Sequence, residues 1–402
     1  MTKTVAVIGG GPAGLMAAEI LAQAGQTVTV YEQKPSLGRK FLMAGRGGLN
    51  LTHSEEFEKF LPRYGAAEKF MTPLIESFTP QMLRAWADDL GQETFIGTSG
   101  RVFPKMFKAS PLLRAWLLRL EKLGVQFKLN HHWLGWRENN LIFKYENKEV
   151  AVAADAVLLA LGGASWPRLG SDGAWTEILQ NKKIEIMPLR PANCGFQINW
   201  SDIFKNKYAG QPVKSVALLF NGIRVPGEIM ITQGGIEGGP VYALSTALRD
   251  AIAQYGSAEL AVDLRPDMTE EQLTKALQRP RAALSFTNYL RKAISLSSPA
   301  IGLLLEQPNR AELGRYSPPQ LAALLKSVPL TLTGTSHIER AISTAGGIAL
   351  SELDNGLMLK KLPGVFAAGE MLDWEAPTGG YLLQGCFATG AAAAHGIINF
   401  LN

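Results

Sequence analysis

The chain has little cysteine and no long apolar run. Its 402 residues include two cysteines, Cys194 and Cys386, which lie far apart and form no C-x-x-C pair. This spacing argues against a disulfide framework, a zinc site and a dithiol redox centre. No apolar stretch is long enough to span a bilayer. An expected strand begins almost at the N-terminus, which leaves no room for a signal peptide. We therefore expect a cytoplasmic protein with no membrane partner.

The excess of positive charge is small. Lys and Arg number 40 against 35 Asp and Glu, which gives a formal net charge of +5. Such a balance serves solubility, or it attracts a polyanion such as RNA. Clusters such as Arg101/Lys105/Lys108 and Arg279/Arg281 are open to both interpretations. No recognised RNA-binding module is visible, and we expect no DNA partner.

The chain does have a glycine-rich turn between an apolar run and a helical pattern. Residues 4–8 are apolar or β-branched, and Gly9, Gly11 and Gly14 follow as G-x-G-x-x-G. The first glycine permits the turn, the second lets the backbone approach a pyrophosphate, and the third lets the helix pack on the strand. The N-terminus of that helix offers unpaired N–H groups to phosphate.

An acidic residue follows at the distance that a dinucleotide site requires. A second strand pattern at 27–31 ends in Glu32, about 20 residues beyond the glycines, where a carboxylate bonds the ribose hydroxyls. Together the two features predict dinucleotide binding; the alternative is a purely structural glycine turn. Residues 38–52 are then rich in glycine and cations, so Arg39, Lys40 and Arg46 can face phosphate. A solvated basic loop is the other interpretation.

Two later apolar strands also end in glycine. Residues 156–161 run into Gly162 and Gly163, and residues 365–368 run into Gly369 and Glu370. The latter carboxylate can bond a ribityl hydroxyl. A small-residue helix expected at 388–398 can aim N–H groups at the N1/O2 edge of an isoalloxazine. An NAD site needs no such second set of residues near the C-terminal end of the sequence, so FAD is the expected dinucleotide.

The pattern of expected secondary structure changes near residue 191. Short strands expected at 216–220 and 227–231 are followed by helical segments from about Tyr242 to Val328. We expect a Rossmann-like α/β domain formed by residues 1–190 and 335–402, interrupted by an inserted mixed β/α domain, 191–334, that covers the flavin. In the first domain, Thr79 and Ser110 are the expected N-caps of two helices.

With these residues in view, the chain resembles the BaiN/RdsA-type FAD-dependent oxidoreductases, also called aminoacetone-oxidase-like flavoproteins, in a shorter branch. The stretches that carry the resemblance are 9–14, 38–52, 100–104, 160–173, 343–347 and 369–390. The resemblance covers nearly the whole chain. The resemblance implies a FAD domain of the glutathione-reductase type with an insert. One departure is that many relatives have a cysteine where Leu49 precedes Asn50, so chemistry through that thiol does not carry over.

The resemblance also implies roles for individual residues. The pyrophosphate is expected along Gly9, Gly11, Pro12, Ala13 and Gly14. The adenosine is expected at Glu32, Gln33 and the backbone of Trp133. The diphosphate and flavin are expected along Arg39, Lys40, Gly45, Gly47 and Asn50, with Gly162 and Gly163 lining the dinucleotide. The ribityl chain is expected at Gly369, Glu370 and Asp373, and the flavin ring at Gly380, Tyr381, Leu382, Leu383 and Gln384.

The sequence is compatible with several classes of reaction. No second dinucleotide fingerprint appears in the insert, so hydride would come from transiently bound NAD(P)H or from the substrate itself. Members of the family are linked to reduction of a uridine in ribosomal RNA, reduction of an unsaturated steroid and oxidation of a small amine. The partner is therefore a small molecule or structured RNA, and the alternative is a protein that binds FAD without turnover. Cys386, Tyr381 and His53 are candidate proton donors, none of them assigned. No metal site is expected, and the oligomeric state is left open.

Overall fold

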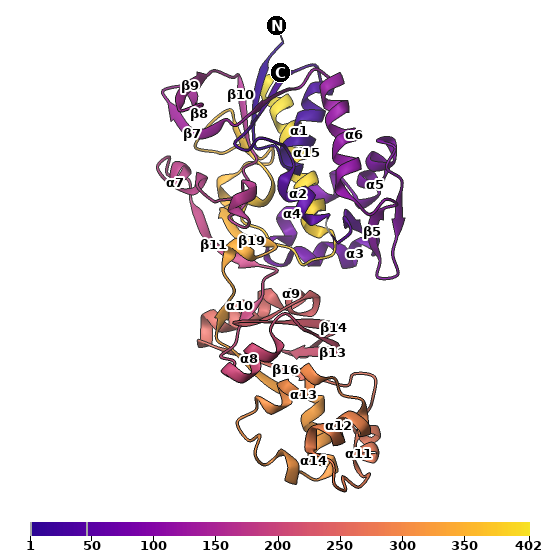
Figure 1. Cartoon of the computed structure of the whole chain (residues 1–402). Coiled ribbons are helices and arrows are strands. Elements are labelled where there is room, and N and C mark those ends of the chain that lie inside the picture. Colours follow the sequence, from indigo (N-terminus) through magenta and orange to yellow (C-terminus); the bar gives the residue numbers. More distant parts are fainter. Residues whose placement is uncertain (1, 46) are drawn as a thin grey trace. The chain divides into compact units, whose positions relative to one another are not determined.

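The computed structural model describes residues 2–45 and 47–402 (Figure 1). Arg46, one of the cations expected to face phosphate, lies outside the described residues. The chain divides into two compact units. Unit 1 comprises Met1–Pro191 and Ile338–Asn402, and unit 2 comprises Ala192–His337.

Unit 1 is built on a five-stranded parallel sheet with the strand order β20-β10-β1-β2-β6. The strands are β1 (Thr4–Ile8), β2 (Thr27–Glu32), β6 (Gln126–Leu129), β10 (Ala156–Leu159) and β20 (Val365–Ala367). The inner strands are nearly continuous apolar runs because a parallel sheet of this class is covered on both faces. The predicted α/β class with a parallel dinucleotide-type sheet is confirmed.

Two helices from opposite ends of the chain pack together beside this sheet. These are α1 (Pro12–Gln23) and α15 (Tyr381–Leu401), which lie side by side in Figure 1. A Cβ atom added at Gly390 would lie 2.3 Å from the carbonyl oxygen of Ala13. The small-residue pattern of α15 therefore permits the two backbones to approach closely.

The remaining elements of unit 1 surround the sheet. The helices are α2 (Arg39–Ala44), α3 (Phe57–Phe60), α4 (Glu68–Ser77), α5 (Pro80–Asp89), α6 (Ala109–Lys122) and α7 (Trp175–Gln180). One three-stranded sheet comprises β3 (Thr52–His53), β5 (Arg101–Pro104) and β4 (Thr94–Ile96), and another comprises β7 (His132–Arg137), β8 (Asn140–Tyr145) and β9 (Lys148–Val152). β11 (Ile186–Ala192) pairs with β19 (Ser343–Ile348). Short 3₁₀ helices span Leu61–Ala67, Pro167–Leu169, Ile338–Arg340, Leu350–Glu352 and Gly369–Met371.

A buried carboxylate ties α1 to two other helices of unit 1. Glu19, only 3% exposed, accepts hydrogen bonds from the indole N–H groups of Trp86 at 3.1 Å and Trp116 at 2.7 Å. Its other oxygen lies 3.1 Å from the guanidinium of Arg119. Trp116 thus lies in the core, Trp86 packs against it, and both indole N–H groups satisfy this charge.

Unit 2 contains a seven-stranded sheet with the order β17-β16-β13-β14-β15-β12-β18, whose paired strands run antiparallel. The strands are β12 (Phe196–Gln197), β13 (Pro212–Phe220), β14 (Ile223–Thr232), β15 (Gly235–Glu237), β16 (Ala258–Asp263), β17 (Val328–Leu332) and β18 (Gly334–Thr335). The helices are α8 (Asp202–Tyr208), α9 (Gly239–Ala243), α10 (Ser245–Tyr255), α11 (Glu270–Leu277), α12 (Phe286–Ile294), α13 (Ser298–Leu305) and α14 (Pro318–Lys326), with a 3₁₀ turn at Leu313–Arg315.

The predicted cap of α6 and one predicted helical stretch were wrong. Ser110 does not cap α6, which begins at Ala109 with Lys108 as its N-cap. Pro111 fits inside the first turn because no intrahelical acceptor is lost there. Strand β16 interrupts the stretch expected to be helical between Tyr242 and Val328, since it inserts between β13 and β17. The capping role of Thr79 is confirmed, because its side chain accepts a hydrogen bond from the backbone N–H of Met82.

None of the described helices has the length and apolarity needed to cross a bilayer.

Candidate functional site

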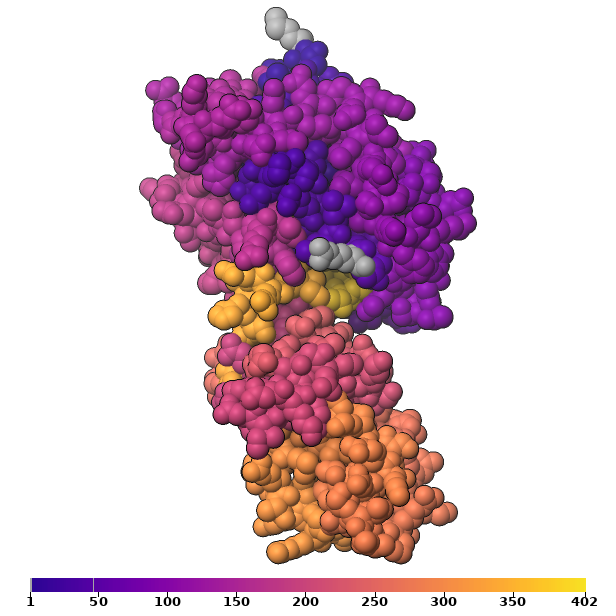
Figure 2. Space-filling model, viewed as in Figure 1, coloured from indigo at the N-terminus to yellow at the C-terminus, as the bar shows by residue number. Residues whose placement is uncertain are grey.

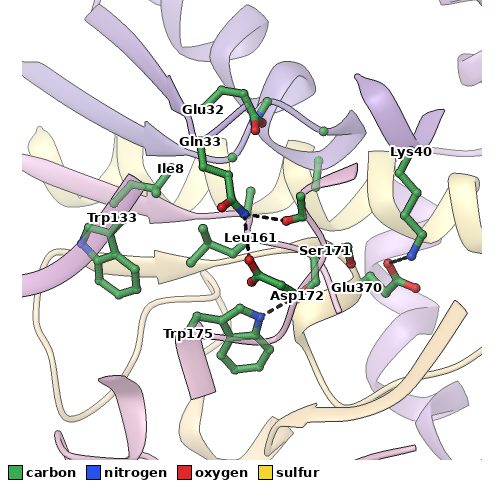
Figure 3. Close-up of a pocket in the computed structure, with 18 of the residues that line it drawn as sticks. Ile8, Glu32, Gln33, Lys40, Trp133, Leu161, Ser171, Asp172, Trp175 and Glu370 are labelled. Carbon is green, nitrogen blue, oxygen red and sulfur yellow. Dashed lines mark hydrogen bonds and ion pairs between the residues drawn. The ribbon is translucent and has the colours of Figure 1, made fainter. Parts of the chain in front are cut away.

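A pocket lies in unit 1 where the carboxyl ends of β1, β2, β10 and β20 meet. Its wall includes the glycine turn after β1, Glu32 at the end of β2, Gly162 beyond β10 and Glu370 beyond β20. Figure 3 shows Glu32 and Glu370 among the side chains that line this pocket. This edge of an open parallel sheet is where doubly wound proteins bind dinucleotides.

The three glycines of the turn differ in what surrounds them. Gly9 has φ +113°, and a Cβ atom there would lie 2.2 Å from the carbonyl oxygen of Ala160. A Cβ at Gly14 would lie 2.1 Å from the carbonyl oxygen of Gly9. A Cβ at Gly11 would meet no heavy atom of the described chain within 4 Å. Packing therefore requires the first and third glycines, whereas Gly11 borders the open pocket at the N-terminus of α1, where backbone N–H groups can bind phosphate.

Glu32 is fixed at the pocket wall by backbone groups. Its carboxylate accepts hydrogen bonds from the N–H of Gly10 at 3.0 Å and from the N–H of Lys34 at 2.9 Å. Burial raises the pKa of Glu32, and these two N–H groups and the charge of Lys34 oppose the rise. The side chain is thus held in one orientation, as a ribose ligand must be.

Gln33 ties the loop after β10 to the end of β2. Its amide nitrogen donates to the carbonyl oxygen of Gly170 at 2.8 Å and lies 3.3 Å from a carboxylate oxygen of Asp172. Its amide oxygen lies 3.1 Å from Nδ1 of His132. These contacts hold the Gln33 amide in the pocket lining, and Figure 3 draws the contact with Asp172 as a dashed line.

Ser171 and Trp175 are examples of lining residues that were not among the predicted site residues. Ser171 is buried, and its hydroxyl has no hydrogen-bond partner within the described chain. Trp175 donates its indole N–H to the carbonyl oxygen of Gly162 at 2.9 Å. The signal that could have found them is the polar pair between Gly170 and Gly173, since glycines flanking polar residues after a strand are typical of a ligand loop.

A lysine and a glutamate from distant segments meet in the pocket. Nζ of Lys40 lies 2.6 Å from Oε2 of Glu370 and 2.6 Å from the hydroxyl of Ser165. The other oxygen of Glu370 accepts from the backbone N–H of Thr344 at 2.9 Å. The buried carboxylate therefore has a partner for each of its oxygens where it lines the pocket. Sequence spacing could not reveal this pair.

The predicted cofactor residues fall into two groups. Those that line the pocket are Gly9, Gly11, Pro12, Ala13, Glu32, Gln33, Arg39, Lys40, Trp133, Gly162, Gly369 and Glu370. Within the described chain, the lining does not include Gly14, Gly45, Gly47, Asn50, Gly163, Asp373, Gly380, Tyr381, Leu382, Leu383 or Gln384. Several of the second group gather instead at the N-terminus of α15.

The N-terminus of α15 forms a polar niche against β3. The helix begins at Tyr381, earlier than the predicted Ala388, because Gly380 adopts a left-handed conformation (φ +95°) against the backbone of Thr52. First-turn N–H groups of a helix have no intrahelical acceptors and carry partial positive charge. Within the described chain three buried side-chain oxygens on these segments have no hydrogen-bond partner: those of Asn50, Thr52 and Gln384. Such atoms indicate a polar ligand edge.

The three candidate proton donors are constrained. The Tyr381 hydroxyl donates to Glu55 at 2.5 Å, and burial together with this carboxylate raises the pKa of Tyr381. Nδ1 of His53 accepts from the N–H of Glu55, so its Nε2–H donates to the carbonyl oxygen of Ser99 at 2.9 Å. Burial raises the pKa of the Cys386 thiol to about 12. Since the first two protons are already donated and the third is firmly held, none of the three is assigned as a catalytic acid.

Histidine, cysteine and carboxylate side chains do not gather into a metal site. Across the described residues, no group of three or more of them could hold a metal ion.

The parallel sheet, the glycine turn and the acidic residues after its strands define a dinucleotide-binding protein of the Rossmann class. Residues 3–396 match the family model described as the HI0933-like protein Rossmann domain, so the chain belongs to this family. It is a FAD-dependent oxidoreductase, and the resemblance found from the sequence is confirmed.

Curated relatives and solved structures match nearly the whole chain. It is 26% identical over 403 residues to the 3-dehydro-bile acid delta(4,6)-reductase of Clostridium scindens, covering 97% of each. It is 24% identical over 400 residues to the ribosomal RNA dihydrouridine synthase of Escherichia coli, covering 98% of this chain and 97% of that protein. The 3-ketosteroid-delta4-(5alpha)-dehydrogenase of Rhodococcus jostii shares the fold, with a TM-score of 0.52 and 17% identity over 98% of this chain and 95% of that one.

The residues present fit FAD. The open space at Gly11 admits a pyrophosphate, and the fixed carboxylate of Glu32 stands where a ribose would bind. The buried Ser171 hydroxyl and the unpartnered oxygens near α15 supply polar groups along a long ligand. A dinucleotide that carries a second polar ring system, such as FAD, fits both the pocket lining and the polar residues at the N-terminus of α15.

Proposed function

We propose that this chain reduces a carbon–carbon double bond conjugated to a carbonyl group, with transiently bound NAD(P)H as the hydride source. Bound FAD supplies the hydride relay between donor and acceptor, while the protein positions both. The observation that carries the proposal is that the reactions named for two relatives are of the same type. Formation of dihydrouridine from uridine and a delta(4,6)-reduction each saturate a carbon–carbon bond, and both names belong to relatives that match over almost the whole chain.

We propose that the cofactor runs from the glycine turn to α15. The pyrophosphate would lie along Gly9–Gly14, the adenosine ribose at Glu32, the ribityl chain at Glu370 and Asp373, and the ring at the α15 N-terminus. Burial raises the pKa of Asp373, and the charge of Arg190 opposes the rise. We also propose a reducing compartment such as the cytoplasm, because the two cysteines of the sequence lie far apart and form no C-x-x-C pair or disulfide framework.

An anaerobic spectrum tests the reaction. We expect the visible flavin band of the purified holoprotein to bleach completely on addition of NADPH or NADH. The band should return when an enone or a uridine-containing RNA is then added without oxygen. A band that stays oxidised with both nucleotides would contradict the proposal, and would favour oxidation of a small molecule or binding of FAD without turnover.

The Glu32 side chain offers a residue-level test. We expect Glu32→Ala to weaken FAD binding by about 10- to 100-fold, since a hydrogen bond to a charged group contributes about 1.5–3 kcal/mol. Glu32→Gln should lose less, because the amide oxygen can still accept from the N–H of Gly10. Titration of apoprotein with FAD measures both, with the exposed Glu121→Ala as the control. Unchanged affinity in Glu32→Ala would remove this residue from the ribose site.

A further inference from the structure

Tyr381, the first residue of α15, is held by several contacts with residues 53–64. It is only 4% exposed, and little of α15, the yellow C-terminal segment, is visible on the face drawn in Figure 2. Its ring stacks on that of His53 with the centroids 5.4 Å apart, and its centroid lies 4.9 Å from that of Phe60. Its carbonyl oxygen accepts a hydrogen bond from the buried Tyr64 hydroxyl at 2.9 Å. Residues 53–64 therefore fix both the side chain and the backbone of Tyr381.

An ion pair from the same segment anchors the Tyr381 hydroxyl. The carboxylate of Glu55 accepts from this hydroxyl at 2.5 Å, and from Nε and Nη2 of Arg63 at 3.1 and 2.9 Å. The guanidinium of Arg63 also lies 5.7 Å from the centroid of the Tyr381 ring. Burial raises the pKa of Glu55, but the hydrogen bonds from Arg63 and Tyr381 outweigh it and hold the pKa below its ordinary value. At neutral pH the pair is thus a carboxylate and a guanidinium whose charges cancel.

The two charges of this pair differ in their exposure to water. The side chain of Glu55 is 12% exposed and that of Arg63 is 48% exposed. A partly buried charge is screened by solvent much less than an exposed one. If its partner were removed, the Glu55 carboxylate would therefore act strongly on its surroundings, whereas the Arg63 side chain can turn into solvent.

The first turn of α15, beside this pair, has backbone N–H groups available to a ligand. Its N-cap is Gly380, which has no side chain to accept from them. The N–H of Gln384 bonds to the carbonyl oxygen of Gly380 at 3.0 Å, so the N–H groups of residues 381–383 precede the first intrahelical bond. Such groups favour a ligand edge that carries negative charge.

We propose that Glu55 and Arg63 are positioning residues, which act through Tyr381 to hold the first turn of α15 against the flavin ring and to set the reduction potential of bound FAD. The inference rests on the proposed function only in the position of the ring at α15. Reduction of FAD places negative charge at the N1/O2 edge of the ring, so charges near that edge alter the potential. A lone carboxylate beside α15 would make reduction harder, and a lone guanidinium would make it easier.

Single variants of the two residues should shift the potential in opposite directions. The potential of the holoprotein is measured anaerobically against a reference dye, which requires neither NAD(P)H nor substrate. We expect Arg63→Gln to lower the equilibrium constant for reduction of FAD at least ~10-fold, which is about 30 mV for a two-electron couple. Glu55→Gln should raise this constant by about 3- to 10-fold, because the charge it leaves on Arg63 is better screened. Glu55→Gln/Arg63→Gln should return within about threefold of wild type, since the pair as a whole is neutral.

A second ion pair in the neighbouring helix α3 supplies the matched controls. Lys59 and Glu56 lie 3.1 Å apart, with side chains 68% and 77% exposed. Lys59→Gln and Glu56→Gln make the same changes of charge, and both should stay within about twofold of wild type.

Arg63→Lys separates the charge of Arg63 from its paired hydrogen bonds. It keeps the positive charge beside Glu55 but loses the planar fork, so its equilibrium constant should stay within about threefold of wild type. If Arg63→Gln does not retain FAD, this variant and the upward shift of Glu55→Gln still test the inference.

Several outcomes would overturn the inference. These are shifts of both single variants in the same direction, shifts no larger than those of the controls, or a double variant displaced as far as Arg63→Gln. Each would leave the pair as a structural support of α15 alone. Bleaching of the wild-type flavin by NADPH or NADH is recorded on the same preparations. If the potentials shift as expected without bleaching, the proposed function fails and the inference stands. If bleaching occurs and the potentials do not shift, only the inference fails.

Discussion

Gly11→Val is expected to abolish FAD binding in a protein that still folds. A side chain at this position meets no described atom within 4 Å, and the extended backbone (φ −89°, ψ −178°) accepts valine. The expected cost to stability is about 1 kcal/mol at most, from the poorer helix cap. The branched side chain would instead occupy the space through which a pyrophosphate approaches the N–H groups of α1. We expect a colourless protein whose FAD affinity, measured by titration, falls at least ~100-fold, since several charge-assisted hydrogen bonds are lost together.

Gly14→Val is the matched control. It changes the same motif, but we expect it to reduce the stability of the fold rather than to block the phosphate site. Its Cβ would lie 2.1 Å from the carbonyl oxygen of Gly9, so the helix must move away from the strand. We expect a destabilisation of about 1–3 kcal/mol or more in the apoprotein. If Gly11→Val keeps FAD within tenfold of the wild-type affinity, the pyrophosphate does not bind at this turn.

Glu19→Ala is expected to destabilise unit 1 by about 3–5 kcal/mol, because it removes one member of a buried ionic network. Two indole N–H groups and the Arg119 guanidinium would lose their common acceptor. Urea denaturation followed by far-UV circular dichroism measures the loss. The control is Asp89→Ala, which removes the other partner of Arg119 but lies 75% exposed. That change should cost about 1 kcal/mol or less. A loss below 1 kcal/mol in Glu19→Ala would show that water satisfies these donors.

Local patterns were sufficient to predict the central sheet. β1, β2 and β10 are apolar runs that end at a glycine or an acidic residue, and such runs are typical of buried parallel strands. The start of α15 was missed, because Gly380 takes its left-handed conformation against Thr52, far away in the chain. β16 was missed because a six-residue strand between helices has too few residues to show its period. In both cases a tertiary partner, absent from the local sequence, determines the structure.

The candidate site also contains some features that the local sequence indicates and others that depend on distant parts of the chain. The glycine turn and Glu32 were found because one short segment carries both the motif and the geometry. The ion pair of Lys40 with Glu370 has no local signal, since its partners come from opposite ends of the chain. The sequence marks the loop of Ser171, but it does not show that the hydroxyl lacks a partner within the described chain, because this depends on how the loop folds over the pocket. The roles of these residues in binding FAD stay predictions.

The interruption of unit 1 by unit 2 has a consequence for synthesis on the ribosome. β10 pairs with β1 on one side and with β20 on the other, but all of unit 2 is translated between β10 and β20. At about 5–20 residues per second, β20 follows β10 by roughly 10–40 s. During this interval the nascent sheet has an open edge that can pair with another chain, and α1 lacks its neighbour α15. Unit 2 is contiguous, so it can fold first, and the carboxylate of Glu370 reaches the pocket only when translation is nearly complete.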